Sequence, residues 1–504
     1  MLRAALLALL LALPAQAEDR PDTVRPPPES PQGALATRPA PPESLDELLE
    51  SVTGSWLFRK ARVGLHIVDV TSGEEVFNRG GDLAMNPAST MKVVTSATAL
   101  KMLGPSYRFS TNVYMNAEAE IDPAGVLRGN VYVKGHGDPT FVVEKLWKMV
   151  LDLKLMGVKR VEGSVVFDDS FHSGGAQLPG WNKPADLKVG PTYFSTLSAL
   201  SLDMNVAVLV VGPGAEVGAA ARVNLETPSA GYVTVDNQTR TGALGSRSWI
   251  EVTRVIKEDG TRFVVRGSVP AGTRRATIRR TVADPAAHFA SAFEKQMEAQ
   301  GIKVTGRWRK GRTPADSKLL VHVPSLTLGS ILMDMNKYSL NFQAEQILRT
   351  LGAEVEGEGS TEAGLRVVEA YLSSLGVPSE GSVLVNGSGL SREAKIAPSA
   401  LTAVLMDMAR DPQVGSEFMG SLAIGGVDGT LWKRLRDEPG RLRGKTGTID
   451  GVHCLTGYLD SDNGRRYAFA FMTNYGSDTR ASMVRQVHDS FARLIFKMGA
   501  EGAD

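Results

Sequence analysis

The chain has 504 residues, of which 42% are hydrophobic, enough to bury the cores of two or three domains. Its 56 Lys and Arg residues nearly balance 55 Asp and Glu residues, so the charge gives no indication of nucleic-acid binding or of a strongly charged membrane partner. Cys454 is the single cysteine, which excludes an intramolecular disulfide.

The N-terminus has the pattern of a secretory signal peptide. A charged start at Arg3 precedes an apolar run to Leu13, and an Ala-x-Ala sequence ends at Ala17. The apolar run is too short to span a membrane. We therefore expect a signal peptide over residues 1–17 and an exported protein of the periplasm or cell-wall space. We expect it to be soluble or peripherally membrane-associated, with no transmembrane anchor.

The segment that follows is a predicted linker, after which regular structure begins. Residues 18–43 are rich in proline and poor in apolar side chains, which predicts an extended linker. The next expected elements are a helix over 45–52, a strand over 63–70, its hairpin return over 74–77 and a helix over 91–103 that Gly104-Pro105 ends.

Between residues 105 and 315 the sequence changes to short β-rich segments. Strands are expected over 107–115, 129–133, 165–167, 205–211, 232–235, 249–255 and 263–265, and helices over 142–156 and from Asp284-Pro285 to before Gly301. This part is expected to be a β-rich insertion of one or two domains, with two small domains favoured.

Helical patterns return after the insertion. Helices are expected from Leu326 to Leu375, with breaks near Tyr338 and Gly357, and again from Pro398. Strands over 452–459 and 466–473 are joined through Asn463-Gly464, a hairpin signal. The final amphipathic helix, over 483–495, could be read as a membrane anchor, but packing on a sheet is the favoured interpretation.

Ser89 and Lys92 are the first residues with a chemical pattern. Residues three apart on a helix share a face, so the Ser89 hydroxyl and the Lys92 amine are expected within hydrogen-bonding reach. Serine needs a base beside it to act as a nucleophile. Lysine can serve only when neutral, and at its ordinary pKa roughly one molecule in a thousand is neutral at pH 7. Burial beside another cation would lower that pKa.

Two later motifs strengthen this hypothesis. Ser339-Leu340-Asn341 lies between helical segments, and Lys445-Thr446-Gly447-Thr448 precedes the terminal hairpin. The order Ser-x-x-Lys, Ser-x-Asn, Lys-Thr-Gly is the active-site set of the penicillin-recognising serine acyltransferases. With Lys134-Gly-His-Gly-Asp-Pro-Thr140, Asn386-Gly-Ser-Gly-Leu-Ser-Arg392, Gly426-Val-Asp-Gly-Thr-Leu431 and the long insertion, the chain resembles the low-molecular-mass class C penicillin-binding proteins, the D-alanyl-D-alanine carboxypeptidase/endopeptidase family.

The resemblance implies an α/β (α+β) fold. A β-lactamase/transpeptidase-like catalytic domain, with an antiparallel sheet flanked by helices, would consist of residues 44–104 and 316–504, interrupted by the insertion at 105–315. It also implies a serine-type D-Ala-D-Ala carboxypeptidase, with D,D-endopeptidase action possible through the same intermediate. The partners would be peptidoglycan stem peptides, with β-lactam antibiotics as acylating inhibitors.

The family's residue roles carry over motif by motif. Ser89 would attack the carbonyl carbon, Lys92 would take its proton, Ser339 would relay the proton to the leaving amine, and Lys445 would tune that serine. Asn341, Thr446, Gly447 and Thr448 would bind the substrate, with the N–H groups of Ser89 and Thr448 as the oxyanion hole. Leu340 and Asn386 depart from the usual family residues, and Leu340 replaces a polar side chain near the cleft.

Other interpretations remain open at this point. One rival is a β-lactamase of the same fold, and another is a cell-wall peptide-binding protein without catalysis. The Asn386-Gly-Ser-Gly segment is either a simple turn or part of the active site. His136, His172 and His453 lack metal-ligand spacing, so neither a metal nor a cofactor is expected. Cys454, among apolar strand residues, is expected to be buried and inert.

Overall fold

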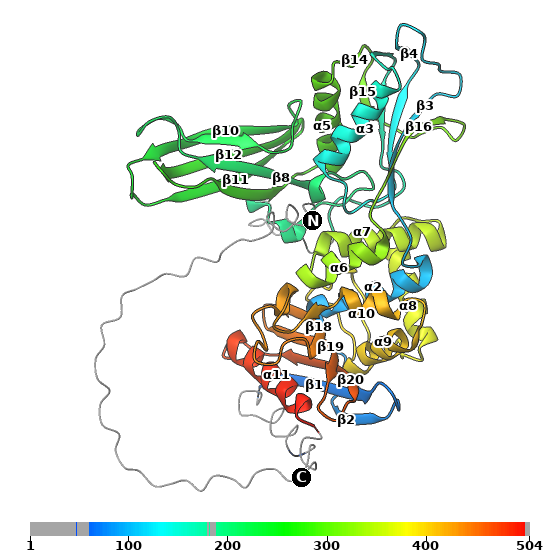
Figure 1. Cartoon of the computed structure of the whole chain (residues 1–504), viewed down its shortest axis with the longest axis vertical. Helices are drawn as coiled ribbons and strands as arrows, with labels where there is room; N and C mark the ends of the chain where they lie inside the picture. The colour runs from blue at the N-terminus through cyan, green and yellow to red at the C-terminus, as the bar shows by residue number, and fades with distance from the viewer. Residues whose placement is uncertain (1–46, 48–59, 179–180, 182–187, 499–504) are drawn as a thin grey trace. The chain divides into compact units, whose positions relative to one another are not determined.

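A computed structural model describes Glu47, residues 60–178, Trp181 and residues 188–498, which belong to the compact unit Asp46–Asp504 (Figure 1). The predicted signal peptide, the linker and the helix over 45–52, apart from Glu47, lie outside the described residues. The described chain forms one six-stranded sheet with helices on both faces, and four smaller sheets.

Segments from both ends of the described chain build the six-stranded sheet. Its strands are β1 (Arg62–Asp69), β2 (Glu75–Arg79), β17 (Ala423–Ile424), β18 (Leu442–Ile449), β19 (Val452–Asp460) and β20 (Arg466–Asn474). Their order is β17-β18-β19-β20-β1-β2, and all neighbours are antiparallel. The predicted antiparallel sheet is thus confirmed, and so is the hairpin of β19 and β20, whose loop spans 461–465 with Gly464 at φ 76°.

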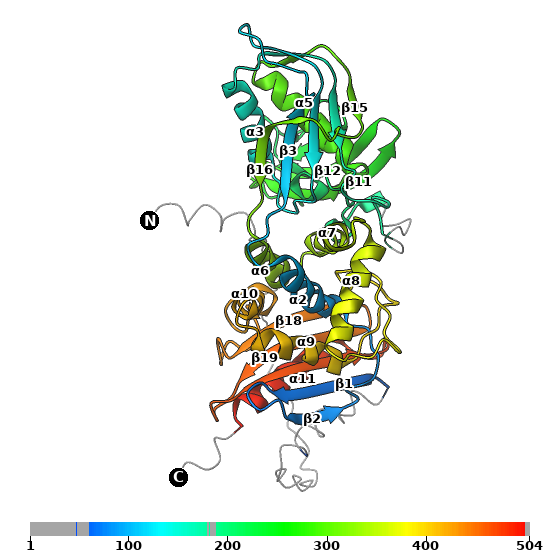
Figure 2. The ribbon, with the colours of Figure 1, turned by 90° about the vertical axis from the view of Figure 1, so that its right-hand side faces the viewer.

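One helix at the centre of the fold is buried on every side. It is α2 (Met91–Leu103), and its residues from Met91 to Leu100 are all buried. Figure 2 shows it among the other helices on this face of the sheet. These are α6 (Leu328–Tyr338), α7 (Asn341–Leu351), α8 (Thr361–Ser374), α9 (Pro398–Arg410) and α10 (Gly415–Ser421). A helix that is buried all round has no polar face, which explains why α2 carries only small hydroxyls and apolar residues around Lys92.

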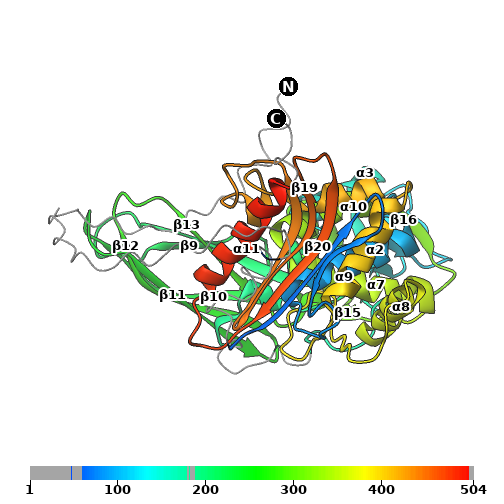
Figure 3. The same cartoon turned by 90° about the horizontal axis from the view of Figure 1, so that it is seen from below.

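The final helix, α11 (Ala481–Phe496), covers the opposite face of the sheet from α9 (Figure 3). The Phe491 ring packs against Phe469 and Phe471 of β20, with centroid separations of 5.3 Å. The predicted packing on a sheet is therefore confirmed. Within the described parts of the chain, no helix is both long enough and apolar enough to cross a membrane.

The junction between α6 and α7 has the predicted break. Tyr338 ends α6, Ser339 adopts a left-handed conformation with φ 59°, and Asn341 begins α7. The left-handed residue ends one helix and redirects the chain into the next. A second predicted break follows α7, where a π-helical turn over Gly352–Glu356 leads to Gly357.

The insertion is β-rich, as predicted, and contains four sheets. The largest has the order β15-β7-β5-β3-β16, with β3 (Ser110–Met115), β5 (Val131–Gly135), β7 (Val165–Asp168), β15 (Trp308–Lys310) and β16 (Lys318–Pro324). The other three sheets have three strands each. The first consists of β4 (Val126–Arg128), β6 (Arg160–Glu162) and β14 (Lys303–Val304), and the second of β8 (Val206–Gly212), β9 (Arg222–Leu225) and β13 (Ala276–Thr281). The third consists of β10 (Val233–Gly242), β11 (Trp249–Lys257) and β12 (Gly260–Pro270). The helices α3 (Val143–Leu155) and α5 (Pro285–Ala299) lie where predicted.

Clusters of buried apolar side chains lie in two parts of the insertion. One includes Phe167 and Phe289 with the helices α3 and α5, and the other includes Phe263 and Val265 of β12. A small cluster of Val211, Ala221 and Val269 shares its partly buried neighbours with the second of them. These clusters favour the proposed two small domains. The pairing of β16 with β3 favours a junction after Pro324 instead of the predicted residue 316.

The Asn386-Gly-Ser-Gly turn packs directly against the segment that carries Ser89. Gly389 has φ 74°, and a Cβ on this residue would lie 1.8 Å from the Ala88 carbonyl oxygen. Asn386 Oδ1 accepts a hydrogen bond from Gly389 N at 2.8 Å, which closes the turn. A glycine is therefore required here for two reasons, the left-handed backbone and the close approach.

The substitution Gly389→Ala tests this contact. The left-handed conformation alone should cost ~1–2 kcal/mol of unfolding free energy, and the overlap with Ala88 a further ~1–3 kcal/mol. Gly376→Ala is the matched control, because Gly376 has φ 75° and a Cβ on this residue would have no neighbouring atom within 4 Å. Urea unfolding should show a clearly larger loss for Gly389→Ala, and equal losses would contradict the close approach.

Candidate active site

Ser89 lies at the entrance to the central helix. It belongs to η3 (Ala88–Thr90), a 3-10 turn directly before α2, whereas the sequence predicted the first turn of the α-helix. The difference arises at Ala88, whose φ of 44° is left-handed. Asn86 Oδ1 accepts a hydrogen bond from Ala88 N at 2.9 Å and holds this conformation. Such backbone strain, on the order of 1–3 kcal/mol, is concentrated at functional sites.

The Lys92 amine occupies the space behind Ser89. Its Nζ lies 3.1 Å from Ser89 Oγ, 2.7 Å from Asn341 Oδ1 and 2.8 Å from the carbonyl oxygen of Ser388. A neutral amine has two N–H donors and one lone pair. Because the carbonyl groups of Asn341 and Ser388 can only accept, they take the two donors. The lone pair is then left for the Ser89 hydroxyl proton.

Burial supplies the physical reason for a neutral amine. Lys92 is completely buried, and loss of hydration lowers its pKa to about 7. The negative charge of Glu345 on α7 opposes this shift. At neutral pH a substantial fraction of the amine is therefore unprotonated, in contrast to an exposed lysine.

Glu345 fixes the turn that binds the amine. Its carboxylate is fully buried and accepts hydrogen bonds from Gly387 N at 3.0 Å and Ser388 N at 2.8 Å. Thr95 of α2 donates to the Gly387 carbonyl oxygen at 2.7 Å. The turn is thus held from α7 through its N–H groups and from α2 through its carbonyl groups, which orients the Ser388 oxygen toward Lys92.

A second buried lysine approaches from the sheet. Lys445 Nζ on β18 donates hydrogen bonds to Ser339 Oγ at 2.9 Å and to the Thr446 carbonyl oxygen at 2.8 Å. Its pKa lies well below the ordinary value, chiefly because of burial and additionally because of the charge of Lys92. Ser339, at the break after α6, therefore lies next to one lysine, while Asn341 lies next to the other.

The edge of the sheet that carries Lys445 reaches the backbone of Ser89. A Cβ on Gly447 would lie 3.1 Å from Ser89 N and 2.6 Å from the Pro87 carbonyl oxygen, so only glycine permits this approach. Thr446 Oγ1 donates to Thr430 Oγ1 at 2.8 Å. The structure thus brings together all three motifs predicted from the sequence.

Thr448 lies next to a histidine that the sequence left without a role. Its Oγ1 is 3.0 Å from His453 Nδ1, on the adjacent strand β19. Burial lowers the pKa of His453 to about 3, so its ring is neutral at physiological pH. A neutral ring nitrogen can therefore fix the rotamer of the threonine hydroxyl at the edge of the site.

Four contacts in and around the site were not predicted from the sequence. Glu345 follows Asn341 by one helical turn, and this i,i+4 spacing was a usable signal. The Ser388 oxygen and the Tyr193 oxygen, which accepts from Asn341 Nδ2 at 3.2 Å, are backbone groups and leave no signal in side-chain types. Trp181 Nε1 also donates to the Leu390 oxygen at 3.1 Å, so the insertion borders the site.

Among the described residues, neither Cys454 nor a cluster of metal ligands takes part in the site around Ser89. Cys454 is buried on β19, as predicted, and burial raises the pKa of its thiol to about 12. In the described ranges, no group of three or more His, Cys, Asp or Glu side chains could hold a metal ion.

Comparison with known proteins identifies a family and relatives that are described as carboxypeptidases. A family model described as the D-Ala-D-Ala carboxypeptidase 3 (S13) family matches residues 45–494. The D-alanyl-D-alanine carboxypeptidase of Actinomadura sp. is 34% identical over 449 residues, which cover 86% of this chain and 80% of that protein. The carboxypeptidase DacB of Haemophilus influenzae is 26% identical over 432 residues, covering 84% of this chain and 88% of that protein.

A solved structure extends the likeness to the fold. The crystal structure of penicillin binding protein 4 (dacB) from Haemophilus influenzae superposes with a TM-score of 0.75 at 25% identity, over 88% of this chain and 99% of that one. The likeness therefore includes the insertion as well as the six-stranded sheet. On the match over residues 45–494, the chain belongs to the D-Ala-D-Ala carboxypeptidase 3 (S13) family.

Proposed function

We propose that this chain is an exported serine D-Ala-D-Ala carboxypeptidase that cleaves peptidoglycan stem peptides through an acyl-enzyme on Ser89. The observation that carries the proposal is the 3.1 Å contact between Ser89 Oγ and the fully buried amine of Lys92. The names of the relatives from Actinomadura and Haemophilus influenzae support the substrate class.

Acylation follows from this geometry. The neutral Lys92 amine takes the Ser89 proton while Oγ attacks the carbonyl carbon between the two terminal D-alanines. The negative charge that develops on the carbonyl oxygen is stabilised by the N–H groups of Ser89 and Thr448. The C–N bond then breaks, and the departing D-alanine amine receives a proton relayed through Ser339. Water later hydrolyses the ester and regenerates the Ser89 hydroxyl.

The remaining motif residues position the substrate. The hydroxyls of Thr446 and Thr448 would bind the terminal carboxylate, and Asn341 would hydrogen-bond the peptide amide. Asn341 Nδ2 has two N–H donors, and its contact with Tyr193 uses one of them. Lys445 acts on Ser339 through its 2.9 Å hydrogen bond.

The position of Glu345 favours the carboxypeptidase over the β-lactamase alternative. Rapid hydrolysis of a penicilloyl-enzyme would be helped by a carboxylate that activates water. The carboxylate of Glu345 is fully buried and already accepts two backbone hydrogen bonds from the turn. These hydrogen bonds hold the carboxylate in the turn, where it is not available to activate a water molecule at the ester. We therefore expect a long-lived penicilloyl-enzyme and slow turnover of nitrocefin. The same acyl-enzyme chemistry would permit endopeptidase cleavage of D-amino-acid cross-links.

The substitution Ser89→Ala tests the proposed nucleophile. Release of D-alanine from a pentapeptide ending in D-Ala-D-Ala should fall at least about a thousandfold, because only binding and oxyanion stabilisation remain. Intact-mass spectrometry should also show no penicilloyl adduct. Ser330→Ala, an exposed serine on α6, is the control and should retain activity. Equal D-alanine release by wild type and Ser89→Ala would remove Ser89 from the mechanism.

The pH dependence of acylation tests the pair of Lys92 and Glu345. Since Lys92 must be neutral, the acylation rate should rise with pH through about 7, the pKa of its amine. The negative charge of Glu345 raises that pKa. Glu345→Gln should therefore shift the midpoint to lower pH, by about one unit or more, and reduce the maximal rate.

Glu345→Asp keeps the charge and is the matched control. Its acylation midpoint should stay near that of wild type even where its maximal rate falls. The rates can be followed with a fluorescent penicillin between pH 5 and 9. A Glu345→Gln midpoint that is unchanged or higher would show that this carboxylate does not act on the Lys92 amine.

A further inference from the structure

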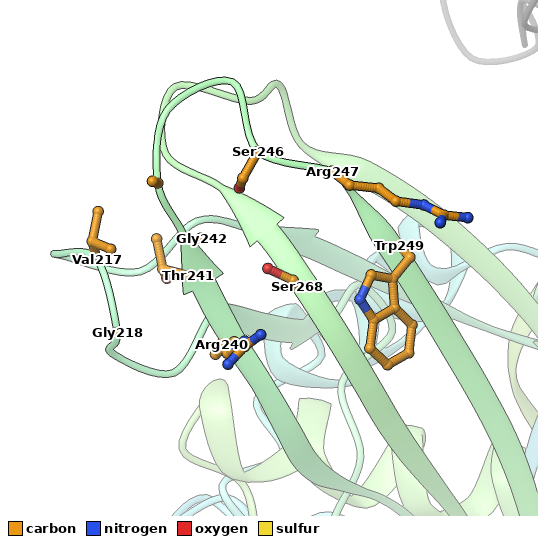
Figure 4. A pocket seen from close by; sticks show the side chains of 10 residues that line it. Val217, Gly218, Arg240, Thr241, Gly242, Ser246, Arg247, Trp249 and Ser268 are labelled. Atoms are coloured by element: carbon orange, nitrogen blue, oxygen red, sulfur yellow. The ribbon is translucent and has the colours of Figure 1, made fainter.

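A pocket of about 730 Å³ lies on the sheet formed by β10, β12 and β11 in the insertion. Figure 4 shows Arg240, Ser268 and Trp249 on three adjacent strands, with Ser246 in the connection above them. None of these residues belongs to the three motifs around Ser89. The pocket is therefore a feature of the insertion and lies outside the catalytic machinery.

Strand register explains how the pocket is built. Ser268 of β12 pairs with Arg240 of β10 on one side and with Trp249 of β11 on the other. Directly paired residues project from the same face of a sheet. Adjacent strands are about 4.8 Å apart, and β12 lies between β10 and β11. The backbone of β10 at Arg240 and that of β11 at Trp249 are therefore about 10 Å apart. Arg240 and Trp249 thus form opposite walls, with Ser268 as the floor.

The floor of the pocket contains polar groups without protein partners. Ser268 is only 7% exposed, yet its hydroxyl makes no hydrogen bond to any other described residue. A Cβ on Gly242 would lie 2.8 Å from Ser268 Oγ and 2.5 Å from Ser246 Oγ, so both hydroxyls lie close to this one position on β10. The Ser268 hydroxyl oxygen still reaches solvent, so a ligand in the pocket can form a hydrogen bond with it.

The walls define the chemistry of that ligand. Trp249 is 48% exposed and offers a flat apolar surface with one N–H donor. The side chains of Arg240 and Arg247 form no ion pair with a carboxylate among the described residues, so both guanidinium groups are available to an anion. An indole face, paired hydroxyls and free guanidinium groups together fit a sugar that bears a carboxylate-containing substituent.

We propose that this pocket is a second peptidoglycan-binding site, which takes the disaccharide and the acidic part of an attached stem peptide. The apolar face of a sugar ring packs on Trp249, sugar hydroxyls bond to Ser246 and Ser268, and a peptide carboxylate pairs with Arg240. The inference rests on the proposed function, because it assumes that the polymer is the substrate.

Such a site would act on the polymer without changing the chemistry at Ser89. Binding one part of a long strand raises the effective concentration of its other stem peptides near the enzyme. The pocket should therefore lower the KM for polymeric peptidoglycan and leave the KM for a free pentapeptide unchanged.

Binding by Trp249→Ala and Arg240→Ala, in the otherwise intact mature chain, tests the site directly. The probe is a soluble muropeptide disaccharide whose peptide ends before the D-Ala-D-Ala pair, measured by isothermal titration calorimetry. Each substitution should weaken binding about tenfold, as expected for a central aromatic or arginine contact. Trp147→Ala is the matched control, because Trp147 is a 49% exposed tryptophan of the same insertion, outside the pocket.

D-alanine release separates this inference from the proposed function. Trp249→Ala should release D-alanine from the free pentapeptide at the wild-type rate, but should have a raised KM for insoluble peptidoglycan. Failure of wild type to cleave the free pentapeptide would refute the proposed function. Unchanged muropeptide binding in Trp249→Ala and Arg240→Ala, with wild-type thermal melting, would overturn the second site alone.

Discussion

The structure depends on one buried amine and the three oxygens around it. Lys92 has no contact with solvent, and its Nζ lies within 3.1 Å of Ser89, Asn341 and Ser388. These partners come from the turn before α2, the start of α7 and a distant loop. Burial lowers the pKa of the amine to about 7, so that a substantial fraction is unprotonated at neutral pH, and two carbonyl acceptors direct its lone pair to the serine. The Lys92 Nζ atom therefore both joins three segments of the fold and is the proposed base for Ser89.

Burial of an ionisable group is costly unless its hydrogen bonds are satisfied, and the fold meets this requirement with backbone groups. Glu345 anchors the N–H groups of the turn at Gly387 and Ser388, so that a carbonyl oxygen of the same turn faces Lys92. Gly389 lets the turn contact the strained segment at Ala88. The glycines of the turn are thus as necessary to the site as the polar side chains.

Much of this arrangement could be predicted from the sequence, because periodicity and turn residues define α2, the break at Ser339 and the hairpin of β19 and β20. The side chains of the three motifs were found since their spacing is chemically specific. The Ser388 carbonyl oxygen could not be found, because any residue type presents the same backbone group. The helical spacing that places Glu345 beside Asn341 was present but was not used. The pocket at Trp249 depends on strand register, which sequence patterns do not determine at the ends of long hairpins.

The most direct test of this account is the titration of the Lys92 amine itself. Lysine labelled with ¹³C at Cε reports its protonation state by NMR, and the Lys92 signal can be assigned with Lys92→Arg. The account predicts a pKa of about 7 for this amine. A Lys92 signal that titrates near 10.4, the ordinary value for lysine, would show that the amine is protonated at neutral pH and cannot be the base that activates Ser89.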